Sequence, residues 1–200
     1  MIELVTAFFI GLGLAASVGF RIFLPLLALS IASYFDIIPV TESFEWIGTI
    51  PAMIALGAAT VLETLAYFIP WFDNLLDTIA LPTASIAGTA VMASTLVELD
   101  PLWQWALAII AGGGTAGLIK GVSANTRLAS TATTGGLVNP VITTAETAAS
   151  AGLSALSVFL WPLAAIIVIG LLVLVIFFFK KLRRLWRKPV NSDSTNPTSG

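Results

Sequence analysis

The chain contains no cysteine and no histidine. Disulfides, thiol chemistry, histidine-ligated metals and histidine-based catalytic triads are therefore excluded. Charge is also scarce: charged residues make up 10% of the 200 positions, whereas a soluble domain carries about 25% because its surface must stay hydrated. Hydrophobic residues make up 58%, and the mean hydropathy is +0.99. This composition predicts an integral membrane protein whose main solvent is lipid.

The few basic residues are unevenly placed. The net charge is −2, yet six of the nine basic residues lie within 180–188, directly after an apolar run. Such a segment is typical of the cytoplasmic flank of a last transmembrane helix, and the acidic remainder of the chain argues against nucleic-acid binding. We expect 181–188 to be this flank and 189–200, which is polar without an apolar pattern, to be a disordered tail. The acidic start at Glu3 predicts that 4–20 is retained membrane structure rather than a cleaved signal peptide.

Long apolar runs divide the rest of the chain. A bilayer core of about 30 Å needs roughly 20 apolar residues in a helix. The run 137–179 would give one helix of about 64 Å, twice that thickness, so we expect a break at Trp161-Pro162. Gly19 to Pro25 interrupts the first run, whose halves are either short tilted helices or a re-entrant pair. We expect a single transmembrane domain, 1–180, with segments near 4–20, 25–36, 47–69, 80–97, 104–121, 137–159 and 162–180.

The expected fold is an all-α, polytopic helical bundle of six or seven membrane segments, built as three helical hairpins followed by a terminal helix. Pro25, Pro82 and Pro140 would each follow the inner turn of a hairpin, where proline suits the first turn of a helix. Phe68 to Asp77 is interpreted as one such turn, with Asp73 and Asp77 capping it or joining a cation site. The charges place the acidic connectors 36–45 and 98–101 outside, and 122–136 and the C-terminus in the cytoplasm.

Four ionisable residues fall inside or at the ends of apolar segments: Arg21, Glu63, Lys120 and Glu146. Such groups cost about 3 kcal/mol each on insertion scales and usually face partners or water. One interpretation is a buried site for an ion or polar solute. The other is that Glu63–Arg21 and Glu146–Lys120 are ion pairs that hold helices together, or that the cations extend to the inner interface.

The stretch from Ser123 to Ser150 is rich in hydroxyl groups and contains Gly-Gly and Asn-Pro. We expect its backbone to leave the helical conformation near the membrane, where it would offer polar groups to a bound ion. Arg127, Thr134, Asn139 and Thr143 are the candidate ligands. The alternative is a flexible loop followed by a helix that packs through small residues. The glycines of 112–121, like Gly11, Gly13 and Gly57, are interpreted as sites of close helix packing.

Three segments carry a family resemblance: Gly19 to Leu26, Phe68 to Asp77 and Ser130 to Pro140. They resemble an uncharacterised bacterial multi-pass membrane family catalogued as domain of unknown function 4126, over about 1–180. This implies residence in a bacterial inner membrane and brings no activity. Gly19 to Leu26 is also similar to a Gly-x-Arg-x-Phe-x-Pro motif in re-entrant segments of DedA-type proteins, a family linked to lipid scrambling and proton-coupled transport. The acidic motif of that family's other re-entrant segment is not evident here.

The leading functional hypothesis is a small transporter or channel for an ion or small polar solute, without enzymatic activity, cofactor or metal. The alternatives are a membrane scaffold or assembly factor, whose polar residues only lock helices, and a lipid-acting membrane protein. The expected partners are the lipid bilayer, the solute itself and further copies of the chain, because a protein this small often needs them to enclose a pathway.

Overall fold

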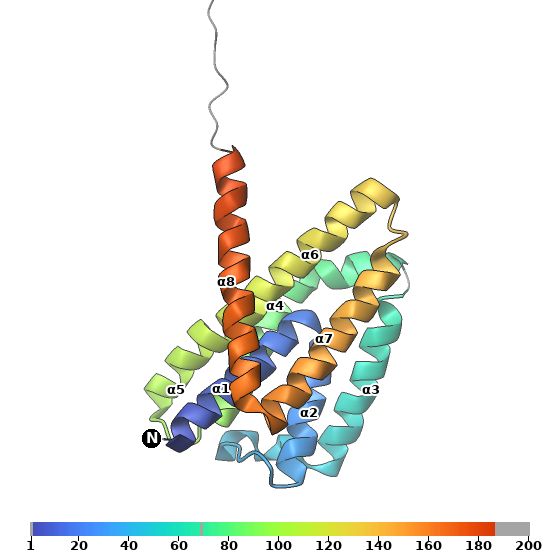
Figure 1. Ribbon diagram of the computed structural model, residues 1–200. Coiled ribbons are helices and arrows are strands. Elements are labelled where there is room, and N and C mark those ends of the chain that lie inside the picture. The colour runs from blue at the N-terminus through green and yellow to red at the C-terminus, as the bar shows by residue number, and fades with distance from the viewer. Residues whose placement is uncertain (1, 69, 187–200) are drawn as a thin grey trace, which may run out of the picture.

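The fold comes from a computed structural model, which describes residues 2–68 and 70–186 except for the side chains of 70–75, 77–78, 178–179 and 181–186. Every regular element in these described ranges is a helix, so the expectation of an all-α chain is confirmed (Figure 1). The predicted tail at 189–200 and the side chains of the basic flank at 181–188 lie outside the described residues. The elements are α1 (Ile2–Phe20), α2 (Phe23–Tyr34), the 3-10 helix η1 (Glu42–Gly48), α3 (Ile50–Ala66), α4 (Pro70–Thr95), α5 (Pro101–Leu107), the π-helix η2 (Ala108–Gly113), α6 (Gly114–Thr134), α7 (Asn139–Phe159) and α8 (Trp161–Trp186).

Local sequence explains several helix boundaries. A proline lies in the first turn of α3, α5 and α7, where its missing N–H costs no intrahelical bond. Thr49 caps α3, since its hydroxyl accepts a hydrogen bond from the backbone N–H of Ala52 at 3.4 Å. Gly135 ends α6 with φ at 64°, a left-handed conformation that glycine adopts without steric cost. Residues 135–138 then turn the chain into α7.

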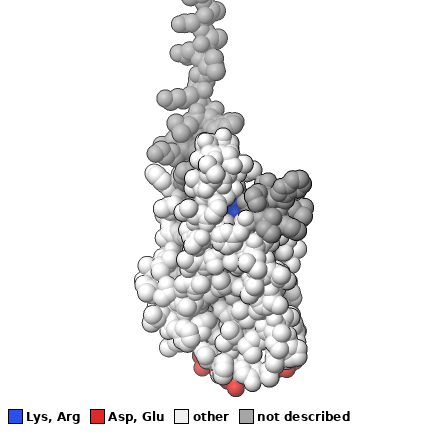
Figure 2. All heavy atoms as spheres, turned by 90° about the vertical axis from the view of Figure 1, so that its right-hand side faces the viewer, with Lys and Arg blue, Asp and Glu red and all other residues white. Residues whose placement is uncertain are grey.

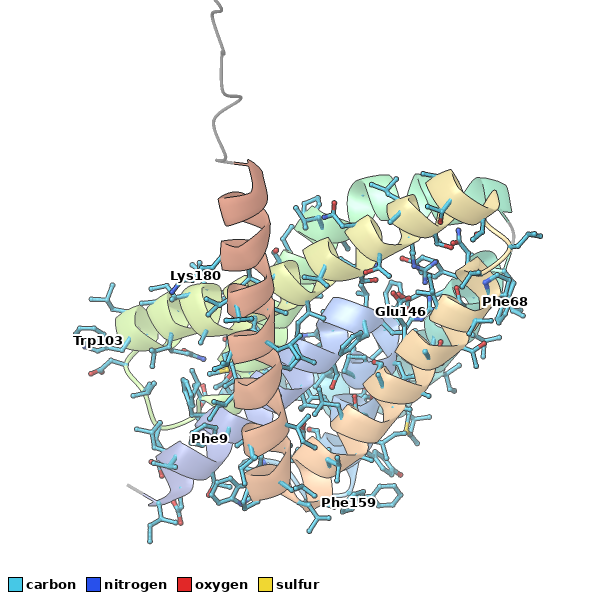
Figure 3. All side chains as sticks on the ribbon, turned by 45° about the horizontal axis from the view of Figure 1, so that its top comes forward. Phe9, Phe68, Trp103, Glu146, Phe159 and Lys180 are labelled. Atoms are coloured by element: carbon cyan, nitrogen blue, oxygen red, sulfur yellow. The ribbon has the colours of Figure 1, made fainter. Side chains whose placement is uncertain are left out.

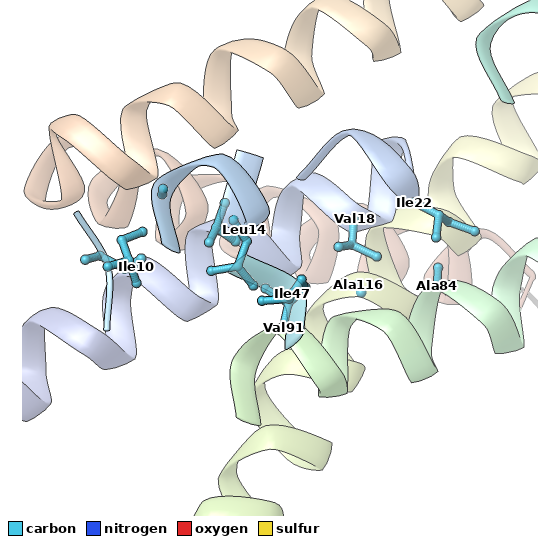
Figure 4. Packing of buried hydrophobic residues seen from close by; sticks show 11 residues of the cluster. Ile10, Leu14, Val18, Ile22, Ile47, Ala84, Val91 and Ala116 are labelled. Carbon is cyan, nitrogen blue, oxygen red and sulfur yellow. The ribbon is translucent and has the colours of Figure 1, made fainter. Parts of the chain in front are cut away.

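Helix α1 is the centre of the bundle and packs against α4, α6, α7 and α8. Its ten residues from Ile10 to Gly19 are all buried, as expected for a helix that is apolar or small on every side. One side of α1 contributes to a core with α4 and α6, seen in Figure 4 as Ile10, Leu14, Val18 and Ile22 with Ala84, Val91 and Ala116. The opposite side packs against α4, α7 and α8 through Leu12 and Ala16.

Helix α4 lies unusually close to η2 and the start of α6. A Cβ atom on Gly112 would lie 2.5 Å from the carbonyl oxygen of Gly88, and one on Gly88 would lie 2.8 Å from the carbonyl oxygen of Gly112. Glycine alone permits this approach of two backbones. The packing interpretation is confirmed here. It was wrong for Gly114, where a Cβ atom would meet nothing within 4 Å, and for Gly57, where it would meet only a Leu27 methyl at 4.0 Å.

Two expectations about the inner turns were wrong. Residues 70–82 belong to α4, which continues through Pro82, so Phe68 to Asp77 is not one extended turn. Helix α6 continues to Thr134, so the hydroxyl-rich stretch is helical up to that residue. The physical reason is visible in the hydroxyls: Thr126 donates to the carbonyl of Val122 at 2.9 Å, and Thr133 to that of Ala129 at 2.8 Å. The hydroxyl groups find their acceptors within the helix, so they do not require the backbone to leave the helical conformation.

Among the residues that the structure describes, two helices are long and apolar enough to cross a bilayer: α1, and the continuous helical rod Pro101–Thr134 that joins α5, η2 and α6. Helices η1 and α3 would add a third span that is bent by 68° at its break. The other apolar stretches whose side chains are described are shorter, for example Phe23–Tyr34 and the part of α8 from Trp161 to Phe177. Figure 2 shows a face almost free of charged side chains, with acidic groups at its lower end. These features are compatible with a membrane protein, and the count of six or seven segments stays a prediction.

Candidate functional site

The turn between α1 and α2 carries a buried arginine. Arg21 follows α1 directly, and only 1% of its surface is exposed. Its Nε donates to the hydroxyl of Thr147 at 3.0 Å, and its Nη2 donates to the carbonyl of Thr143 at 3.1 Å. Both acceptors belong to α7, so the guanidinium joins the α1–α2 turn to α7.

Glu63, in the last turn of α3, holds the same turn from another side. Its two carboxylate oxygens accept hydrogen bonds from the backbone N–H groups of Ile22 at 2.9 Å and Phe23 at 3.1 Å. These are among the first N–H groups of α2, which have no intrahelical acceptor and carry the positive end of the helix dipole. Glu63 is therefore a capping residue supplied by a neighbouring helix, and the expected Glu63–Arg21 ion pair does not form.

Helix α6 presents three polar side chains on one face, because Lys120, Ser123 and Arg127 are spaced at i, i+3 and i+7. Arg127 forms an ion pair with Glu146 of α7, through Nη2 and Oε2, and its Nε lies 3.4 Å from Oε1. The Ser123 hydroxyl donates to the same Oε1. Figure 3 shows Glu146 between α6 and α7. The partner of this glutamate is thus Arg127, where the sequence suggested Lys120.

A tyrosine lies at the centre of these cations. Tyr67 follows α3 directly and is 3% exposed. The guanidinium carbons of Arg21 and Arg127 lie 4.1 Å and 4.5 Å from its ring centroid, and the Nζ of Lys120 lies 5.0 Å from it. Lys120 also donates a hydrogen bond to the phenolic oxygen at 2.9 Å. The ring face is an electron-rich acceptor for cations, so Tyr67 brings three positive groups together.

We call Arg21, Glu63, Tyr67, Lys120, Arg127 and Glu146 the ionic cluster. At most 8% of any of these residues is exposed. Sequence reasoning found five of the six and missed Tyr67. The available signal was its spacing, since Tyr67 lies four residues after Glu63 and therefore on the same helical face.

The other predicted ligands are placed differently. Thr143 borders the ionic cluster through its carbonyl, and its side chain is fully buried. Asn139 and Thr134 lie at the turn between α6 and α7, where Asn139 donates to the hydroxyl of Thr131 at 3.2 Å and Thr134 donates to the carbonyl of Ser130 at 2.7 Å. The side chains of Asp73 and Asp77 lie outside the described residues.

Two buried polar atoms at the ionic cluster have no hydrogen-bond partner among the described residues. They are the Nη1 of Arg21 and the Oγ1 of Thr143. The two residues are in contact, because the other terminal nitrogen of Arg21 donates to the Thr143 carbonyl. Buried polar atoms are nearly always satisfied by protein or by ordered water, so each of these two atoms can still bind a further small group.

Two apolar cavities reach the ionic cluster from different sides. A cavity of about 380 Å³ lies among α6, α7 and α8, and Ser123 and Glu146 are part of its wall. A second, of about 410 Å³, lies among α2, α3 and α4, and its wall includes Glu63 and Tyr67. No cluster of three or more acidic side chains suited to a metal ion occurs within the part of the chain that the structure describes.

Residues 8–181 match the model of a family described as Domain of unknown function (DUF4126). The chain belongs to this family. The resemblance drawn from its motifs is confirmed, whereas the similarity to DedA-type proteins and the bacterial origin stay predictions. No curated protein and no solved structure matches the chain. Membership in this family assigns no activity to the chain, and the ionic cluster is its candidate functional site.

Proposed function

We propose that this chain is a multi-pass membrane protein that conducts or transports an ion or a small polar solute through the ionic cluster. The observation that supports this is the burial of five ionisable side chains around one tyrosine. They come from the α1–α2 turn and from helices α3, α6 and α7. The polar path would therefore lie where these four elements meet.

Burying the ionic cluster costs free energy. Moving an ionised side chain out of water costs several kcal/mol, and a buried ion pair often stabilises a fold less than apolar residues of the same volume would. A structural lock alone would be built more stably from leucine and phenylalanine. Charged residues inside a membrane segment therefore favour the hypothesis of a transport or relay site.

The membrane placement rests on the surface of the bundle. Large apolar side chains of α3, α4 and α8 are widely exposed, for example Ile54, Ile86 and Leu174 at 67–70%. Lipid is the solvent that tolerates such a surface. We propose six or seven membrane segments, with short α2 and the bent η1–α3 pair completing them, in a bacterial inner membrane. The C-terminal basic flank would face the cytoplasm.

The test is ion flux in proteoliposomes, with protons, sodium, potassium and chloride assayed separately. Glu63→Gln, Glu146→Gln and their double variant remove the cluster's negative charges, and Tyr67→Phe removes only the phenolic oxygen. Glu98→Gln is the matched control, because Glu98 is an exposed carboxylate beyond the far end of α4. We expect flux in the wild type and the control, and its loss or strong reduction in the cluster variants. Undiminished flux in folded Glu→Gln and Tyr67→Phe proteins would contradict this site.

One observation favours a scaffold as the second candidate. All four carboxylate oxygens of the cluster have protein partners, on the backbone of the α1–α2 turn and on α6. A scaffold predicts that the Glu→Gln variants lower the melting temperature while the wild type shows no flux for any ion. It also predicts a stoichiometric membrane partner in cross-linked native membranes.

A further inference from the structure

The two arginines that stack on Tyr67 differ in their partners. Arg127 is paired with the carboxylate of Glu146. Arg21 uses Nε and Nη2 on neutral oxygens of Thr147 and Thr143. Within the described part of the chain no carboxylate lies at ion-pair distance from it, and its Nη1 has no acceptor. A buried guanidinium whose Nη1 has no acceptor can still donate hydrogen bonds to a further group.

Thr143 supplies the second half of the same site. Its side chain is completely buried, and its hydroxyl has no partner among the described residues. Several threonines of these helices donate their hydroxyl to the carbonyl four residues earlier, as Thr147 does to Thr143 at 2.8 Å. Thr143 leaves that bond unmade, so its hydroxyl is available to donate to a neighbouring group.

We propose that Arg21 and Thr143 hold a small monovalent inorganic anion, of the chloride, bromide or nitrate class, and that this anion is the ion moved through the cluster. The inference rests on the proposed function for its transport step, whereas the binding step stands alone. A water molecule would satisfy the hydrogen bonds of both groups but would bring no negative charge into direct contact with the guanidinium, on which Glu63 and Glu146 act only from beyond ion-pair distance. An anion supplies both.

Size and charge of the anion follow from the surroundings. Arg21 and Thr143 are at most 1% exposed, and neither lines one of the two cavities described above, so only a small ion could be accommodated between them. The carboxylates of Glu63 and Glu146 belong to the same cluster and would repel a second negative charge. A single small charge is therefore the best match.

Thr143→Val is the decisive variant. Valine keeps the shape of threonine, and both hydrogen bonds that Arg21 gives to α7 end on atoms the substitution leaves in place. The matched control is Ser154→Ala, which removes another buried and unpartnered hydroxyl from the same helix, 11 positions further along α7. A merely structural role of buried hydroxyls would affect both variants alike.

The experiment measures thermal unfolding of the purified protein in detergent, in sodium chloride, bromide, nitrate or gluconate at equal ionic strength. A ligand that binds only the folded state raises the melting temperature with its concentration. We expect the melting temperature of the wild type to rise saturably with chloride, bromide or nitrate but not with gluconate. Ser154→Ala should show the same rise. In Thr143→Val, the anion concentration that gives half of the rise in melting temperature should be at least about tenfold higher, because a hydrogen bond to a charged group is lost. Equal melting temperatures of the wild type in all four salts would overturn the proposal.

Flux of radioactive chloride into proteoliposomes then separates the two claims. Anion-dependent stabilisation without chloride uptake would leave the anion site standing and refute transport. Uptake of a cation or neutral solute without anion-dependent stabilisation would refute the anion site and leave the proposed function standing. Uptake that Thr143→Val reduces and Ser154→Ala does not would support both.

Discussion

Glu63 caps a helix that lies 41 residues earlier in the chain, through the backbone N–H of Ile22 at 2.9 Å. A second bond, to Phe23, uses the other carboxylate oxygen. The residue therefore fixes the start of α2 against the end of α3, and it sets the position of the α1–α2 turn that carries Arg21. A glutamate that looks like a solute ligand in the sequence has a structural role as well.

The first prediction concerns that cap. Glu63→Gln keeps one acceptor oxygen, loses the charge and places an amide N–H₂ against a backbone N–H. We expect the free energy of unfolding to fall by about 2 kcal/mol, measured by denaturant titration in detergent. Glu98→Gln should change it by less than about 0.5 kcal/mol, since exposed substitutions have small effects. Equal stability of the two variants would show that the cap contributes nothing.

The second prediction concerns the contact between α4 and η2. Gly112→Ala would place a methyl group 2.5 Å from the carbonyl oxygen of Gly88, which lies on backbone and cannot rotate away. We expect a loss of about 2 kcal/mol as the helices separate. Gly114→Ala, two residues later, meets no atom within 4 Å and should stabilise the helix by up to about 1 kcal/mol. Thermal unfolding of the two variants should therefore shift in opposite directions.

The sequence predicted which residues are chemically unusual better than it predicted how they pair. Glu63, Glu146, Arg21 and Lys120 stand out because ionisable groups are rare in apolar segments, and burial brings all four into one cluster. Their partners depend on the relative placement of α3, α6 and α7. Periodicity within one helix contains no information about that placement, so Arg127 could not be recognised as the partner of Glu146.

Composition also misled the interpretation of Ser123 to Thr134. Hydroxyl-rich segments are common outside helices, yet these hydroxyls bond to the carbonyl groups of the preceding turn and leave the helix intact. Likewise Pro82 suggested a helix start, whereas α4 already begins at Pro70. In both cases the tertiary environment outweighed the local preference, and a single sequence offers no measure of that environment.

The third prediction separates the two contributions of Tyr67. Tyr67→Phe keeps the ring beneath the three cations and removes one hydrogen-bond acceptor of Lys120, so we expect the free energy of unfolding to fall by about 2 kcal/mol. Tyr67→Leu also removes the aromatic face, so its free energy of unfolding should be lower by at least about 1 kcal/mol more. Unfolding curves in detergent measure both. If the phenylalanine and leucine variants are equally stable, the cation–π contacts are incidental.

The final prediction tests whether Arg127 and Glu146 act as a pair. Each single substitution, Arg127→Leu or Glu146→Leu, breaks the ion pair and leaves its other charge buried, and should cost about 3 to 5 kcal/mol. The double variant removes both charges and should cost clearly less than the sum, giving a coupling energy of about 2 kcal/mol or more. Ser123→Ala serves as a reference, since it removes one hydrogen bond to Glu146 and leaves the ion pair in place. Additive losses would mean that the pair contributes no coupling. If the double variant is more stable than the wild type and has lost flux, the charges are retained for transport and not for the fold.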